Sequence, residues 1–323
     1  MRIRWNSIVT LAVVVALLVL VQMIFAVQAP AGQQGAGVGA RGGGGGAGAP
    51  GQGGGGRGGR GAAQPAAPAG PAPRLPNGKP DLSGHWANPY TPNMAGRGAV
   101  LDPTKRNPDG TYAPLTWDHQ GEAIPESKGT PKTFDLPYTD WGRKQWAEYD
   151  PVANGDYAGS CLPFGMSRNI NSPHGLQMVH NNDALAILFE QNTWFHFIPT
   201  SDAFKWPADL PPAWNGVSRG HWDGDTLVVE TTGFNGWTRL DTNGHPHSKD
   251  VKMINTFLRT DSNTIQHTVT IHDPKAYTRD WLNARVWRLK PANDVLMEYS
   301  CEENNLGVYD GAIKRWTPPE NID

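Results

Sequence analysis

Arg219-Gly-His-Trp-Asp-Gly-Asp-Thr-Leu-Val-Val-Glu-Thr-Thr-Gly-Phe234 holds the clearest turn and strand pattern of the chain. At its centre, Asp223 and Asp225 flank a glycine, which is the composition that a tight β-hairpin turn prefers. The apolar residues that follow predict a strand over 227–231. The two aspartates also have the spacing of a Ca²⁺ loop, but the other oxygen ligands of an EF-hand are missing. We therefore expect a hairpin, with a catalytic role for Asp225 as the alternative.

Working outward, the chain beyond Cys161 alternates with a period of two, which is typical of half-buried strands. Besides 227–231, the predicted strands are Ala184–Phe189, Thr193–Ile198, Lys252–Arg259, Thr264–His272, Ala284–Leu289 and Val295–Cys301. Short turns between them predict a mainly β fold, an antiparallel meander that forms either a barrel-like (lipocalin-like) core or a sandwich. One short helix is expected between Thr139 or Asp140 and Pro151, and long loops are expected over 87–138.

The first 76 residues differ in composition from the rest. Residues 1–30 have a basic start and an apolar run over 8–27, which predicts a signal peptide or an N-terminal membrane anchor. Residues 31–76 are rich in Gly, Ala and Pro, which predicts a disordered tether. Residues 77–323 are expected to form one β-rich domain. The sequence therefore predicts a periplasmic or extracellular protein that meets a membrane only through residues 8–27.

The charge of the predicted domain argues against nucleic acid as a partner. Residues 1–75 hold six arginines and no acidic residue, so 28 − 6 = 22 basic groups face all 30 acidic groups in the remainder. The net charge there is 22 − 30 = −8, without a basic stripe for phosphates.

The only two cysteines are Cys161 and Cys301. In an exported chain they are expected to form one disulfide, with two buried free thiols as the alternative.

Several ionisable side chains are candidates for acid–base chemistry. His267 alternates with apolar residues and should face the core, where a histidine is either a hydrogen-bonded core residue or a proton-transfer group. We expect His221 and Glu230 to face the same place as His267. Tyr277 and Arg259, at strand ends, complete the catalytic candidates together with Asp225.

Other motifs give weaker indications. His245-Pro-His247 is a weak candidate metal site, because exposed turn histidines are common. Thirteen tryptophans are a heavy load for one domain, and packing of a large β core accounts for most of them. Trp194, Trp222 and Trp281 are the candidates for binding a substrate. The sequence contains no dinucleotide, Walker, G-x-S-x-G or H-E-x-x-H motif, so no cofactor is expected.

Several segments resemble an exported bacterial family whose members are mostly hypothetical proteins. They are Pro80–Gly84, Cys161–Gly165, Gly220–Phe234 with its Gly-His-Trp-x-Gly-Asp-Thr-Leu-Val-Val string, Gly244–Ser248 and Glu298–Asn304. The resemblance implies export and a β architecture, but no reaction. The chain departs from the family at Phe195 and at Asn255-Thr256, where relatives carry charged residues.

Taken together, the sequence predicts an exported β-barrel-like protein that acts on a small, partly hydrophobic or aromatic ligand. The favoured interpretation is cofactor-independent acid–base chemistry of the lyase, isomerase or hydrolase type. The alternative is a periplasmic protein that only binds its ligand in an aromatic-lined pocket.

Overall fold

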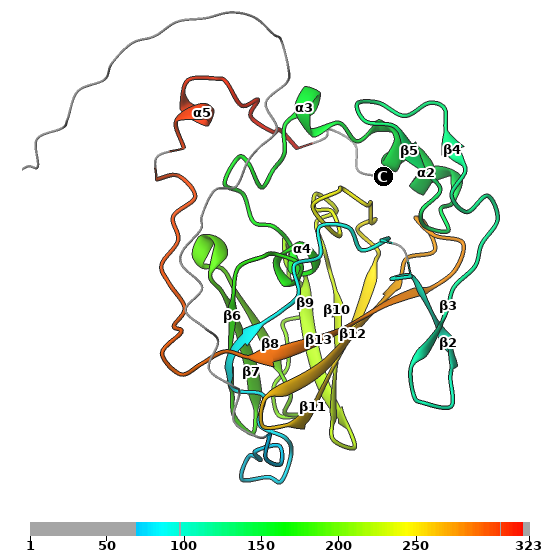
Figure 1. Cartoon of the computed structure of the whole chain (residues 1–323). Helices are drawn as coiled ribbons and strands as arrows, with labels where there is room; N and C mark the ends of the chain where they lie inside the picture. The colour runs from blue at the N-terminus through cyan, green and yellow to red at the C-terminus, as the bar shows by residue number, and fades with distance from the viewer. Residues whose placement is uncertain (1–68, 97, 304, 319–323) are drawn as a thin grey trace, which may run out of the picture. The chain divides into compact units, whose positions relative to one another are not determined.

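The computed structural model describes residues 69–96, 98–303 and 305–318 (Figure 1). The expected signal or anchor over 1–30 lies outside the described residues, as does the tether over 31–76 up to residue 68. In the part of the chain that is described, no helix combines the length and apolar character needed to cross a bilayer.

Strands make up most of the regular structure. They are β1 (Gly84–Ala87), β2 (Leu101–Arg106), β3 (Tyr112–Pro114), β4 (Ala123–Ile124), β5 (Lys132–Thr133), β6 (Leu176–His180), β7 (Ala184–Phe189), β8 (Phe195–Pro199), β9 (Val217–Asp223), β10 (Thr226–Thr232), β11 (Lys252–Asp261), β12 (Thr264–His272) and β13 (Trp281–Leu289). The helices are α2 (Asp140–Glu148), α3 (Pro151–Asn154), α4 (Met166–Ile170), α5 (Leu306–Tyr309) and the 3₁₀ turn η1 (Gln191–Thr193).

The main sheet runs in the order β8-β7-β6-β1-β13-β12-β11-β10-β9, and every neighbouring pair is antiparallel. Its two ends approach each other, because His196 Nε2 of β8 lies 2.6 Å from Ser218 Oγ of β9. The sheet is therefore a nearly closed barrel, which decides between the barrel and the sandwich. The mainly β prediction is confirmed.

The strand connections are a meander with one exception. β6 to β8 and β9 to β13 are two consecutive series, but β1 lies between β6 and β13 and joins them. The predicted hairpin at Asp223-Gly-Asp225 is confirmed, since Asp223 pairs with Thr226 across a two-residue turn in which Gly224 has a φ of 57°.

Alternation fills the barrel with apolar side chains. On β12, Ile265, His267, Val269 and Ile271 are buried, so the inner face predicted for this strand is confirmed. Trp86, Trp281 and Trp287 are the largest of the fully buried side chains.

Two expectations about secondary structure were incomplete. The segment Val295–Cys301 is not a strand: residues 290–303 and 305–318, the C-terminal segment, run over the surface and contain only α5. Alternation alone does not make a strand where no free sheet edge lies alongside. The predicted helix is α2, capped by Thr139, and the one-turn helices α3, α4 and α5 are too short to show a period.

The predicted disulfide is present between Cys161 and Cys301. It ties the C-terminal segment to the chain just before α4. All five residues of α4 are buried, and Ser167 Oγ donates to Leu240 O at 2.7 Å. In Figure 1, α4 lies beyond the upper ends of the strands.

Helix α2 packs closely on the turn that follows β12. Thr139 donates through its N–H to Ala276 O and through its hydroxyl to Lys275 O. Gly142 faces the same turn, where an added Cβ would lie 2.0 Å from Ala276 O. The glycine therefore sets how closely the helix approaches the barrel.

Gly142→Ala should destabilise the protein by about 2 kcal/mol, because the methyl group forces α2 away from the turn. The matched control is the pair Lys144→Ala and Lys144→Gly at an exposed position of the same helix. There alanine should be more stable than glycine by about 1 kcal/mol. Urea denaturation measures both differences, and the close packing is wrong if alanine also stabilises position 142.

Candidate functional site

A cavity of about 550 Å³ lies beside α2 and α3, next to the loop between β10 and β11 (residues 233–251, the β10–β11 loop) and the C-terminal segment. This rim cavity has an aromatic wall from three parts of the chain. The aromatic residues are Trp141, Tyr149, Tyr157, Trp237 and Trp316. Its size is that of an ordinary small-molecule site.

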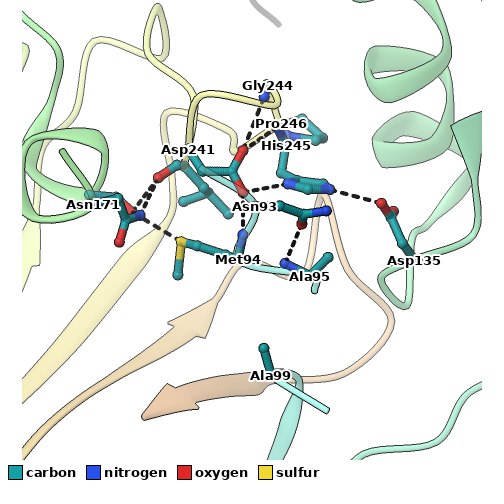
Figure 2. Close-up of polar contacts among 12 residues, drawn as sticks. Asn93, Met94, Ala95, Ala99, Asp135, Asn171, Asp241, Gly244, His245 and Pro246 are labelled. Atoms are coloured by element: carbon teal, nitrogen blue, oxygen red, sulfur yellow. Dashed lines mark hydrogen bonds and ion pairs between the residues drawn. The ribbon is translucent and has the colours of Figure 1, made fainter. Parts of the chain in front are cut away.

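The β10–β11 loop forms one side of the rim cavity and carries a buried ion pair. His245 Nδ1 lies 2.6 Å from Asp241 Oδ2, and His245 Nε2 lies 3.0 Å from Asp135 Oδ2. Figure 2 shows the imidazole between the two carboxylates. The ring of Trp146 stacks on it with 4.5 Å between the centroids. Both ring nitrogens have carboxylate acceptors, so the geometry requires the doubly protonated imidazolium.

The environment of His245 favours that charge. Burial is the largest effect and lowers the pKa, but attraction by Asp241 and the hydrogen bonds to Asp135 and Asp241 outweigh it and raise the pKa of His245 to about 10. For Asp241, burial raises the pKa, and the nearby His245 together with backbone donors lowers it below its usual value.

Further bonds hold the rest of the buried loop. Asp273 accepts from the N–H of Ser248 at 2.6 Å and from its hydroxyl at 2.9 Å. Tyr277 Oη donates to Pro246 O at 2.6 Å. Gly244 has a φ of 97°, and a Cβ there would lie 2.0 Å from the ring of Tyr149, so a side chain is excluded twice. These contacts fix the backbone of residues 244–248, and this part of the loop therefore gives the cavity a rigid wall.

Two cations line the rim cavity: Lys314, which donates to Ala153 O at 2.6 Å, and Arg239. The Arg239 guanidinium lies over the ring of Tyr149, 5.2 Å from the centroid, and burial lowers its pKa. No described residue supplies a hydrogen-bond acceptor to this guanidinium. Tyr149 Oη and Trp237 Nε1, which belong to the same lining, are buried and also lack partners among the described residues. Three sets of donors thus remain available at the cavity.

The carboxylates of the lining are mostly engaged elsewhere. Asp156 forms a two-pronged pair with Arg168 at 2.8 and 2.6 Å. Asp150 accepts from the N–H groups of Val152 and Ala153 at the start of α3. Glu148 is exposed to solvent on α2. Arg239 therefore has no carboxylate bonded to it.

His247 also lines the cavity, and its imidazole is a candidate general base there. Its Nδ1 lies 2.8 Å from Ser248 O, so this nitrogen is assigned the proton, and its Nε2 accepts from Thr238 Oγ1 at 2.6 Å. Burial lowers the pKa of His247, so the ring is neutral near pH 7. A hydroxyl, a neutral imidazole and a fixed carbonyl in series resemble the arrangement that activates a nucleophile.

The expected convergence of His221, Glu230 and His267 is wrong. His267 is fully buried inside the barrel. His221 and Glu230 are exposed on the outer face, and Glu230 has Lys252 Nζ 3.7 Å away. The hairpin register explains the error: it turns Leu227, Val229 and Thr231 inward and the residues between them outward.

The other catalytic candidates lie apart from one another. Asp225 forms an ion pair with Arg74 at 2.6 Å, and Tyr277 is buried beneath the β10–β11 loop. Arg259 lies over Trp86 at the far end of the barrel. None of the six catalytic candidates belongs to the lining of the rim cavity.

The remaining site predictions also fall outside the cavity, except His247. Trp281 is buried in the core, and Trp194 and Trp222 are half-buried against it. His245 and His247 have both ring nitrogens engaged, and no group of three potential metal ligands occurs among the residues described.

The sequence does not predict Arg239 or most of the cavity tryptophans, because these residues lie in irregular segments. One signal was available: Trp141, Gln145 and Tyr149 lie on the same side of the predicted helix, and all three line the cavity.

Comparisons of the chain with known protein families, curated proteins and solved structures each found no match.

The charged His245 should make stability depend on pH. Its folded pKa is raised above the unfolded value, so its contribution is complete below about pH 6.5 and is lost as pH rises toward about 10. Relative to His245→Gln, the wild type should lose up to about 1.4 kcal/mol of its advantage per pH unit in that window. Urea denaturation from pH 6 to 9.5 measures the difference, and a constant difference would contradict a charged His245.

Proposed function

We propose that the described domain binds a small, partly aromatic anion in the rim cavity. The observation that carries this proposal is Arg239, a half-buried guanidinium that lines a cavity with an aromatic wall and has no acceptor from the described residues. A buried cation without a bonded acceptor is costly, and an anionic ligand would relieve that cost.

The remaining lining suits the rest of such a ligand. Trp141, Trp237 and Trp316 offer flat apolar surfaces on which an aromatic or apolar body can stack. Tyr149 Oη and Trp237 Nε1 can donate to oxygen atoms of the ligand. Burial raises the pKa of Tyr149, so its hydroxyl stays protonated and remains a donor. The chemistry fits an aromatic carboxylate or a related monoanion.

We also propose that the protein acts outside the cytoplasm. The disulfide between Cys161 and Cys301 supports this location, since such bonds persist in oxidising compartments.

Calorimetry with a series of benzoate and phenylacetate derivatives tests the binding proposal. Arg239→Met should weaken binding of the best ligand by about tenfold or more, because it removes the charge-assisted bonds to the anion. Replacing the carboxylate of the ligand by an amide should have a similar effect on the wild type and little effect on Arg239→Met.

The matched control is Arg219→Met, which removes an arginine of the outer barrel face that pairs with Asp202. It should leave binding unchanged. If no anion of the series binds the wild type, or if Arg239→Met binds equally well, the cavity is not an anion site.

Acid–base chemistry is a second candidate function, and the bond between Thr238 and His247 favours it. His247 would serve as the general base at the cavity, and its Nδ1 is already fixed by Ser248 O. Because the Nε2 lone pair accepts from the Thr238 hydroxyl, a ligand held by Arg239 would react through that hydroxyl, whose proton His247 would take, without a cofactor.

Turnover of aryl esters and other activated aromatic substrates tests this second function. His247→Gln should lower the rate by about 10²- to 10⁴-fold. His267→Gln, inside the barrel, is the control and should retain activity. Loss of activity only in His267→Gln would place the base in the barrel instead. No turnover by the wild type would leave binding as the function.

A further inference from the structure

The inward side chains of the barrel strands carry positive charge and no carboxylate. The inward positions of the nine strands that form the barrel contain Arg259 and Arg285 and no Asp or Glu. The carboxylate whose charge acts on Arg285 is Asp241 of the β10–β11 loop, which is paired with His245. The inward histidines do not add charge near pH 7, because burial lowers their pKa values, to about 4 for His180 and His196 and well below the usual value for His267.

The two inward arginines are satisfied very differently. Arg259 donates to four backbone carbonyls at its end of the barrel, with distances of 2.5 to 3.3 Å. Arg285 has one partner, Asn283 Oδ1, which accepts from Nε at 2.7 Å. Both Nη1 and Nη2 of Arg285 are buried and have no acceptor among the described residues, although the residue is only 8% exposed.

Other donors without acceptors lie around His267, the cross-strand neighbour of Arg285. Arg285 is directly opposite His267 on β12, and Trp287 is the next inward residue of β13. Asn255 Oδ1 accepts from His267 Nε2 at 3.0 Å, which leaves Asn255 Nδ2 without a partner. Trp287 Nε1 is buried and unpartnered as well. Native interiors rarely leave this many neighbouring donors unmet.

The geometry of these donors selects the chemistry of the acceptor. Because Nε is occupied, Nη1 and Nη2 are the donors that lack acceptors, and their planar fork matches the two oxygens of a carboxylate. Water could accept the hydrogen bonds, but it would not balance the charge. The rings of Phe257 and Trp287, which flank His267 with centroids 5.0 and 4.7 Å away, supply an apolar surface for a short carbon chain.

We propose that the barrel interior binds a small organic carboxylate, held end-on by Nη1 and Nη2 of Arg285. This interior site is distinct from the rim cavity, since Arg285 is not part of that lining. It does not depend on the function proposed for Arg239.

Thermal unfolding of the full chain in sodium acetate and in sodium chloride, at equal ionic strength, tests the interior site. Acetate should raise the melting temperature of the wild type relative to chloride, with an apparent affinity that Arg285→Met lowers by about tenfold or more. Comparison of variants cancels the general effects of salt. Arg288→Met, which replaces an exposed arginine of the same strand, should respond to acetate as the wild type does.

A second variant and measurement cover the case in which Arg285→Met does not fold. Arg285→Lys keeps the charge but removes the fork, and the resonance of ¹³C-labelled acetate should broaden with the wild type and not with this variant. The proposal is overturned if acetate and chloride act equally on the wild type. It is also overturned if only chloride gives an effect that depends on Arg285, which would identify an inorganic-anion site.

Discussion

The ion pairs of the His245 imidazolium with Asp241 and Asp135 are the interaction on which the arrangement around the rim cavity depends. The imidazolium joins the β10–β11 loop to the segment before α2, and through Trp146 it also contacts that helix. A buried charge of this kind is a poor source of net stability, but removing one partner leaves the others uncompensated. The ion pairs therefore hold the backbone of the β10–β11 loop in one conformation. This conformation positions Arg239 and His247, which belong to the same loop.

The sequence predicts those features that depend on residues close together in the chain, and it does not predict those that depend on residues far apart. β7 and β12 were predicted to the residue, because alternation is a local signal. Glu230 shows the limit: its outward direction depends on strand register, which is set by partners that lie far apart in the chain. Arg239 was missed for a related reason. It lies in an irregular loop. Whether its guanidinium has an acceptor depends on which residues surround it in the folded protein.

Three arginines of the domain show how the partners of a buried cation decide its role. Arg259 is surrounded by carbonyls and needs nothing further, so its role is structural. Arg239 and Arg285 have no bonded carboxylate, and one lies at the rim and the other inside the barrel. A domain that is acidic overall thus keeps positive charge where water is scarce, and at such places an anion is bound more strongly than at the surface.

The bridge between Cys161 and Cys301 has a consequence for the wall of the rim cavity. Trp316 and Lys314 belong to a segment that forms no strand and follows β13 through a long irregular path. Anchoring that path at Cys301 shortens the free chain that leads to Trp316 and so raises the effective concentration of this ring at the cavity. The covalent bond lies outside the cavity, yet it restricts the segment that carries one wall of the cavity.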